Sequence, residues 1–291
     1  MWVSASEKSL RERIASCGAD PLETAIAARY RHGLDIEIPE LSERVFISTA
    51  AKGLFPSHFA VRQLVLEALL QKPIGSRLWI RTDSQGRTAP DTLTLSPRTF
   101  NLYLPDALTR VPDPERLVLR SRILKSTLLL IAPTGGLDPF QTMFSDTWEH
   151  RGAFEVNGNT RTAILGLLGK GAGSTPSGDD MLVGAAAVCT LFKNADGPAS
   201  GIAASWLTAL ASCETRFPAL TTLMSTGYLK TALQDRFGSH LIALLKCLSL
   251  PSHRSLYASV LRVKKHGNTS GLDPLAGVTL ACRMIGRALQ P

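Results

Sequence analysis

The sequence lacks the long apolar runs that a membrane protein needs. No stretch approaches the ~18 to 20 consecutive apolar residues required to cross a bilayer. Residues 1–7 lack the basic start and apolar segment of a signal peptide. Five cysteines are spread over 291 residues without close pairing, which is typical of reduced, buried thiols rather than of disulfides or a metal site. We therefore expect a cytoplasmic protein with no membrane association.

Several catalytic and nucleotide-binding signatures are also missing. The sequence has no phosphate-binding Gly-Lys-Ser/Thr loop of Walker A spacing, no dinucleotide-binding glycine pattern after a strand, and no Gly-x-Ser-x-Gly elbow. The six histidines form no pair with metal-ligand spacing. The formal charge of +8 is scattered, without the basic stripe or aromatic consensus of nucleic-acid-binding proteins. A small anionic substrate accounts for this charge, and we expect no nucleic-acid partner.

The pattern of apolar residues changes near residue 150. Before it, segments 76–81 and 92–96 alternate as strands do, whereas 117–131 fits either a strand or a helix. After it, helical segments are predicted over 160–168, 181–192, 202–213, 220–237, 241–250, 255–263 and 274–289. We predict an α+β fold, in which a β-rich N-terminal portion (1–150) packs on a mainly α-helical C-terminal portion (151–291).

A glycine-rich turn occurs twice in the C-terminal portion. The first turn spans 169–184 and the second spans 267–277; aligned on Ser177 and Ser270, both read Ser-Gly-x-Asp-x-Leu-x-Gly. Each precedes an apolar segment rich in small residues, so each should lead from a loop into a buried helix. Because unpaired N–H groups at a helix N-terminus attract phosphate and carboxylate groups, the doubled turn predicts an anion-binding site.

The candidate substrate-binding residues belong to the two turns and to a hydroxyl-rich segment between them. Glycine permits positive φ and a close approach of the backbone to a ligand. Hydroxyl groups and one lysine can donate hydrogen bonds to anion oxygens. The predicted binding residues are Lys170, Gly171, Gly173, Thr175, Ser177, Gly178, Thr222, Ser225, Thr269, Ser270 and Gly271.

Three aspartates, Asp179, Asp180 and Asp273, are the candidate catalytic groups. If the two turns converge, Asp180 and Asp273 could share a Mg²⁺ ion or hold an amino group. A purely structural role stays open, because aspartate as an N-cap followed by Pro274 at the first helical position is an ordinary helix start. Two adjacent carboxylates are more than one cap requires, which favours a functional role.

Three elements of the sequence resemble the AllH family of bacterial proteins. They are the string Thr-Pro-Ser-Gly-Asp-Asp at 175–180, a Thr-Thr-x-x-Ser element at 221–225, and Thr-Ser-Gly-x-Asp-x-Leu-x-Gly at 269–277. Their order and spacing match from 169 to 277, whereas the N-terminal half matches only in general character. Ala172 and Ser174 stand where proline and leucine are expected, and they leave the loop chemistry intact.

The resemblance implies a role with oxamate carbamoyltransferase, the last step of anaerobic allantoin catabolism, an enzyme associated with several different subunits. That enzyme interconverts oxalurate plus phosphate with oxamate plus carbamoyl phosphate, so every reactant carries a phosphate or carboxylate. We expect the chain to be one such subunit, with other carbamoyltransferase subunits as partners and with Asp180 and Asp273 orienting the carbamoyl nitrogen or a metal. Two alternatives stay open: a non-catalytic binding or assembly subunit, and an ATP-dependent phosphotransferase.

Overall fold

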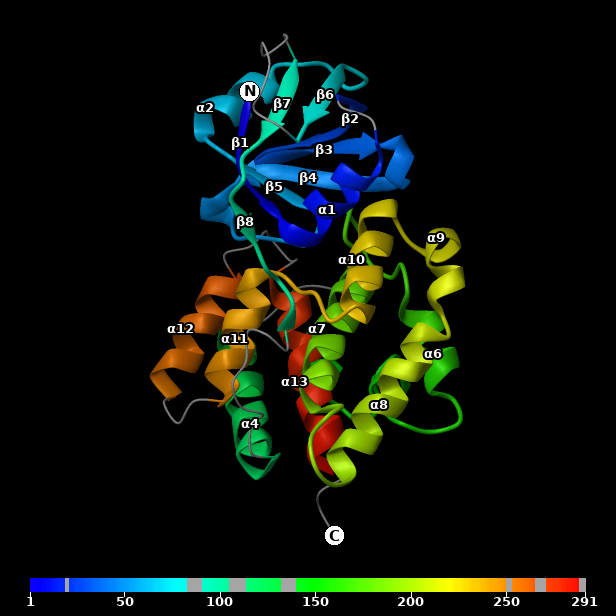
Figure 1. The fold of residues 1–291 in the computed structure, drawn as a ribbon. Coiled ribbons are helices and arrows are strands. Elements are labelled where there is room, and N and C mark those ends of the chain that lie inside the picture. Colours follow the sequence, from blue (N-terminus) through cyan, green and yellow to red (C-terminus); the bar gives the residue numbers. More distant parts are fainter. Residues whose placement is uncertain are drawn as a thin grey trace. The chain divides into compact units, whose positions relative to one another are not determined.

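The structure is a computed structural model that describes residues 1–18, 21–82, 91–104, 114–131, 140–249, 253–264 and 271–287. It divides into two compact units, Met1–Leu102 and Tyr103–Pro291, called here the barrel unit and the helical unit. The first is built mainly of strands and the second of helices (Figure 1), which confirms the predicted α+β class.

The barrel unit is a closed barrel. Its strands are β1 (Trp2–Glu7), β2 (Leu22–Tyr30), β3 (Gly33–Ile38), β4 (Glu43–Thr49), β5 (His58–Val61), β6 (Arg77–Arg81), β7 (Thr92–Leu95) and β8 (Thr99–Phe100). They lie in the order β5-β4-β3-β2-β6-β7-β1-β8, and a further pairing of β5 with β1 closes a seven-stranded ring. Helices α1 (Lys8–Ser16) and α2 (Gln63–Leu70) complete the unit.

Alternating residues of the strands fill the barrel. Leu34 and Ile36 of β3 pair with Ile47 and Val45 of the antiparallel strand β4, and all four side chains are completely buried in one apolar cluster. Successive side chains of a strand point to opposite faces, so every second residue of these strands points into the core. Closure leaves the ring without the unpaired edges that invite aggregation.

The helical unit contains the segments that were predicted to carry the site. Its helices are α4 (Pro114–Ile131), α5 (Phe140–Met143), α6 (Thr160–Leu167), α7 (Ser177–Phe192), α8 (Pro198–Ala211), α9 (Phe217–Leu220), α10 (Leu223–Leu233), α11 (Ser239–Ser249), α12 (His253–Lys264) and α13 (Leu272–Arg287). The ambiguous segment 117–131 is helical, and it belongs to the second compact unit, which begins at Tyr103.

Helices α7 and α13 form the centre of this unit. They lie side by side and run in the same direction (Figure 1), and nearly all of their residues are buried. A helix that is apolar on all sides requires neighbours all round, which the surrounding helices α4, α8, α10, α11 and α12 provide. Within the described ranges, no helix has the length and apolar character needed to cross a bilayer.

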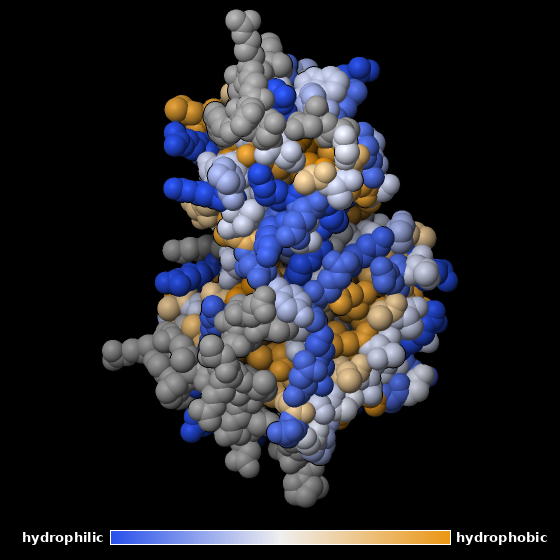
Figure 2. All heavy atoms as spheres, viewed as in Figure 1, coloured by the Kyte–Doolittle hydropathy of each residue, from blue (hydrophilic) through white to orange (hydrophobic). Residues whose placement is uncertain are grey.

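On the face seen in Figure 2, hydrophilic and hydrophobic residues are mixed in both units. Exposed apolar side chains include Leu64 and Ile74 in the barrel unit, and Leu119 and Leu130 in the helical unit. Single exposed apolar side chains are normal on protein surfaces, so these residues alone assign no partner.

Candidate functional site

The two glycine-rich turns bring α7 and α13 together through reciprocal contacts. A Cβ atom at Gly184 would overlap the carbonyl oxygen of Pro274, and a Cβ atom at Gly277 would overlap the carbonyl oxygen of Met181. In the aligned motif, Gly184 corresponds to Gly277 and Met181 corresponds to Pro274. The two helices are therefore related by a local twofold axis, and glycine permits their backbones to touch.

A second pair of glycines repeats this relation at the beginning of the helices. A Cβ atom at Gly178 would overlap the carbonyl oxygen of Leu167, at the end of α6. The equivalent atom at Gly271 would overlap the carbonyl oxygen of Val263, near the end of α12. Each copy of the motif thus docks the start of one helix against the end of the helix before it.

Asp180 and Asp273 occupy equivalent positions of the motif and interact electrostatically. Burial raises the pKa of Asp180 well above its ordinary value, the charge of Asp273 raises it further, and a hydrogen bond from Thr175 opposes the shift. Burial raises the pKa of Asp273 from 3.8 to about 6, opposed by the nearby hydroxyl of Ser177. These side chains, called here the aspartate pair, are only 8% and 1% exposed.

The aspartate pair has carboxyl oxygens without partners. Among the described residues, neither oxygen of Asp273 and only one oxygen of Asp180 has a hydrogen-bond partner, although the Ser177 hydroxyl lies near enough to lower the pKa of Asp273. A buried polar group without a partner costs about 1–3 kcal/mol, and more when it is charged. Such oxygens are suited to receive a donor group or a cation from a ligand.

Neither member of the aspartate pair is an N-cap. Helix α7 begins at Ser177 and α13 begins at Leu272, so both aspartates lie within the first turns of their helices. The residue that precedes α7 is Pro176, which has no side-chain capping group. The simple capping role that the sequence left open therefore does not explain the two carboxylates.

Asp179 has a different position from the aspartate pair. Its carboxylate accepts hydrogen bonds from the Gly169 N–H (2.9 Å) and from the Thr221 hydroxyl. Burial raises its pKa, while these bonds and the nearby Ser225 hydroxyl oppose the shift. Asp179 therefore ties the first turn to the segment between α9 and α10. Thr221 is not among the predicted binding residues, although the doubled threonine at 221–222 marks this position.

The first turn exposes part of its backbone. Gly169, Gly171 and Gly173 have φ values of 72°, 107° and 101°, and residues 171–174 are exposed. The Gly178 N–H donates to the Lys170 carbonyl (2.9 Å) and is thus already paired. The N–H groups of Gly171 and Gly173 find no acceptor among the described residues. Alternating positive φ values of this kind form concave arrangements of N–H groups that bind anions.

The remaining predicted residues have mixed outcomes. Thr222 is the N-cap of α10, since its hydroxyl group accepts a hydrogen bond from the Ser225 N–H (3.1 Å). The same hydroxyl group donates to the Ser174 carbonyl (2.6 Å). The Ser225 hydroxyl is buried near Asp179. The Lys170 side chain is exposed beside the first turn. Thr269 and Ser270 lie outside the described residues.

The aspartate pair would supply part of a metal site. No group of three or more His, Cys, Asp or Glu side chains that could hold a metal occurs in the described part of the chain. Mg²⁺ is usually bound by one or two carboxylates and by water or substrate oxygens, so two carboxylates with unpartnered oxygens fit this ion.

Helices α7 and α13 also contain two cysteines at equivalent positions. Cys189 and Cys282 each follow the motif serine by the same interval, and both are completely buried. Burial raises the pKa of the Cys189 thiol, and Cys282 raises it further. The twofold relation thus extends along the helices from the aspartates to the cysteines, about 13 Å farther on. The equal spacing was visible in the sequence.

A comparison with family models agrees with this description. Residues 167–282 match the model described as oxamate carbamoyltransferase subunit AllH, which confirms the resemblance. The matched segment begins at the end of α6 and reaches Cys282 in α13, so it contains both turns and the aspartate pair. No solved structure matches the chain.

Proposed function

We propose that this chain is a subunit of a carbamoyl-transferring enzyme that converts oxalurate and phosphate to oxamate and carbamoyl phosphate. The family-model match links the chain to a subunit of oxamate carbamoyltransferase. The observation that carries the proposal is the buried aspartate pair, whose oxygens lack partners within the described residues. Its position between the two matched turns makes it the centre of the proposed site.

The carbamoyl group suits this pair chemically. Its NH₂ group has two hydrogens, and carboxylate oxygens of Asp180 and Asp273 without partners can accept one each. Recognition of this kind orients the carbamoyl carbon without covalent chemistry by the protein. The exposed N–H groups of Gly171 and Gly173, with Lys170 beside them, would bind the phosphate or the carboxylate of the substrate.

The raised pKa values give the pair a second role. In the proposed reaction, a phosphate oxygen attacks the carbamoyl carbon and gives up its proton, the bond from this carbon to the oxamate nitrogen breaks, and that nitrogen gains a proton. Near neutral pH, Asp180 retains its proton more firmly than Asp273, whose pKa is about 6. Two carboxyl groups with separated pKa values can provide a general acid beside a carboxylate. Asp179 would act as a positioning residue.

The test is the activity of the reconstituted assembly with substituted aspartates. We expect Asp180→Asn and Asp273→Asn each to lower the rate of carbamoyl phosphate formation by about 100-fold or more, as loss of a general acid or base does. Asp196→Asn, at an exposed position, is the matched control and should leave the rate unchanged. Full activity of both pair variants would refute a catalytic role and favour a non-catalytic assembly subunit.

A metal requirement can be tested in the same assay. If Mg²⁺ binds the aspartate pair, chelation with EDTA should abolish activity and added Mg²⁺ should restore it. If the pair instead holds the carbamoyl NH₂ group, chelation should have no effect while the asparagine variants remain inactive. Turnover by the partner subunits without this chain would support the assembly role.

A further inference from the structure

A cavity of about 230 Å³ lies between α4 and α13, away from the glycine-rich turns. Its lining comes from one face of α4, from the second half of α13, and from Phe144. Val118 and Gly286 close its floor, because a Cβ atom at Gly286 would lie 2.5 Å from the Val118 side chain. The two helices therefore touch at one side of the cavity and leave space at the other.

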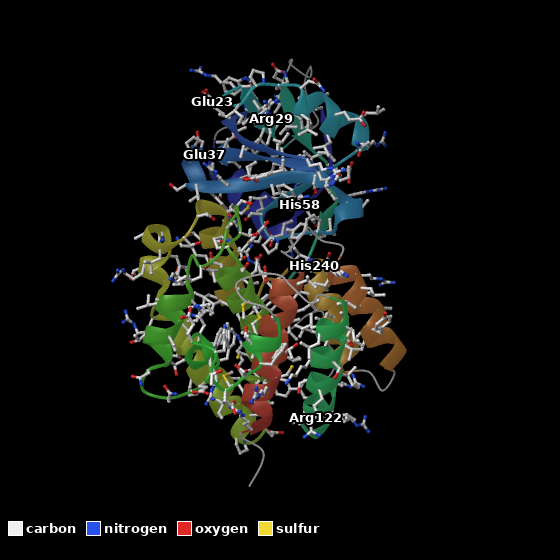
Figure 3. The ribbon with its side chains drawn as sticks, turned by 180° about the vertical axis from the view of Figure 1, so that it is seen from behind. Glu23, Arg29, Glu37, His58, Arg122 and His240 are labelled. Carbon is white, nitrogen blue, oxygen red and sulfur yellow. The ribbon has the colours of Figure 1, made fainter. Side chains whose placement is uncertain are left out.

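The cavity is strongly basic. Arg122 and Lys125 of α4 and Arg283 and Arg287 of α13 all line it, and its lining contains no acidic residue. Arg122 extends outward from α4 (Figure 3), and Lys125 lies 5.4 Å from the centre of the Phe144 ring. Neither of these two side chains has a carboxylate partner in the described part of the chain.

The two arginines of α13 have two acidic neighbours, and the carboxylate of Glu155 lies 3.9 Å from Arg287. The side chain of Asp146 lies 3.1 Å from Arg283 and 3.5 Å from Arg287. It is 68% exposed, and exposed ion pairs contribute little free energy. Asp146 and Glu155 both also pair with Arg151, and neither lines the cavity, so the four basic side chains keep an excess of positive charge that would attract an anion.

This cavity is separate from the aspartate pair. Along α13, the lining residues Thr279 and Arg287 lie about 9 Å and about 21 Å beyond Asp273, at 1.5 Å per helical residue. Neither aspartate and no residue of the first turn lines the cavity. A ligand bound here would therefore not occupy the site described above.

We propose that this cavity binds a small multivalent anion, such as a phosphate ester or a polycarboxylate. The charged groups of the anion would contact the four basic side chains. Arginine provides planar pairs of donors that match phosphate and carboxylate oxygens. The carbon skeleton of the anion would lie against Val118 and Phe144. The proposal does not depend on the function of the aspartate pair.

Calorimetric titration of the full chain with inorganic pyrophosphate and with citrate tests this site. We expect the preferred probe to bind at one site, and the double variant Arg122→Gln/Lys125→Gln to weaken binding by at least about tenfold. The control variant Lys230→Gln/Lys246→Gln removes the same charge from exposed helical positions and should change binding less than twofold. Failure of both probes to bind, or equal binding by the two double variants, would overturn the proposal.

Two further measurements separate this site from the aspartate pair and from effects on folding. The Asp180→Asn/Asp273→Asn variant should bind the same probe unchanged, and loss of binding there would place the anion at the turns instead. In the unmodified protein, the probe should protect Lys125 from acetylation while Lys230 reacts at its usual rate, as measured by peptide mass spectrometry. Equal acetylation of Lys125 with and without the probe would contradict binding in the cavity.

Discussion

Replacement of Asp273 by asparagine should stabilise the protein, although this residue lies at the centre of the proposed site. Both carboxyl oxygens of Asp273 are buried without a partner among the described residues, and its neighbour Asp180 is another carboxyl group. Asparagine removes the charge that burial disfavours, keeps the shape of the side chain, and can donate a hydrogen bond to Asp180. Residues that lower stability in this way are typical of functional sites.

The sign and size of the effect follow from the pKa. Burial raises the pKa of Asp273 from 3.8 to about 6, so the folded state holds this proton more tightly than the unfolded state. Unfolding therefore releases a proton, and stability falls as the pH rises from about 4 to about 6. Above pH 7, the ionised Asp273 lowers the free energy of unfolding by about 3 kcal/mol relative to its value at low pH. About half of this loss is already present at pH 5.

Urea denaturation followed by circular dichroism at pH 5, 6, 7 and 8 measures this effect. The free energy of unfolding of Asp273→Asn should exceed that of the unmodified protein by up to about 3 kcal/mol at pH 8, and the difference should shrink towards pH 5. Asp179→Ala is the contrasting variant: it removes a carboxylate that has partners, so it should destabilise the protein by about 1–3 kcal/mol. A less stable Asp273→Asn at pH 8, or a difference independent of pH, would refute the reasoning.

Three further predictions concern the same helices. Gly277→Ala should destabilise the protein by about 3 kcal/mol, because the added Cβ atom would overlap α7. Gly201→Ala in α8 should stabilise it by up to about 1 kcal/mol, because the added Cβ atom meets free space. Thermal denaturation compares the two variants, and equal midpoints would contradict the described packing of α7 and α13. Cys189 should resist iodoacetamide until the protein unfolds, because burial raises the pKa of its thiol. The partly exposed Cys17 should react first. Mass spectrometry of labelled peptides measures both reactions. Thr221→Val removes the hydrogen bond to Asp179 and should cost about 1–3 kcal/mol in urea denaturation; no loss would mean that the bond is unimportant.

Local patterns in the sequence predicted individual elements, but not the closure of the barrel. The alternation over 76–81 and 92–96 corresponds to β6 and β7. In β6 only one face is buried, whereas all four residues of β7 are buried. The ring closes only where β1 meets β5, for example at Val3 and Val61. This contact joins residues far apart in the chain, and periodicity within a short window carries no information about it.

The ambiguity over 117–131 has a similar origin. In α4, the completely buried residues Leu117, Leu124 and Leu128 recur at helical spacing. Further leucines at 119 and 130 are exposed, and they obscure this period in the sequence. The segment is helical, and the second compact unit begins at residue 103.

The repeated motif predicted two buried helices, whereas their parallel packing emerges only from the structure. Two parallel helices place two positive dipole ends side by side, each equivalent to about +0.5 charge. One proton on the pair leaves one negative charge beside them, which nearly neutralises these ends. If both carboxyl groups were ionised, an excess negative charge would be buried. If both were protonated, the positive ends of the helix dipoles would have no compensating charge. The twofold packing therefore favours a singly protonated aspartate pair, the state that the proposed acid–base role requires.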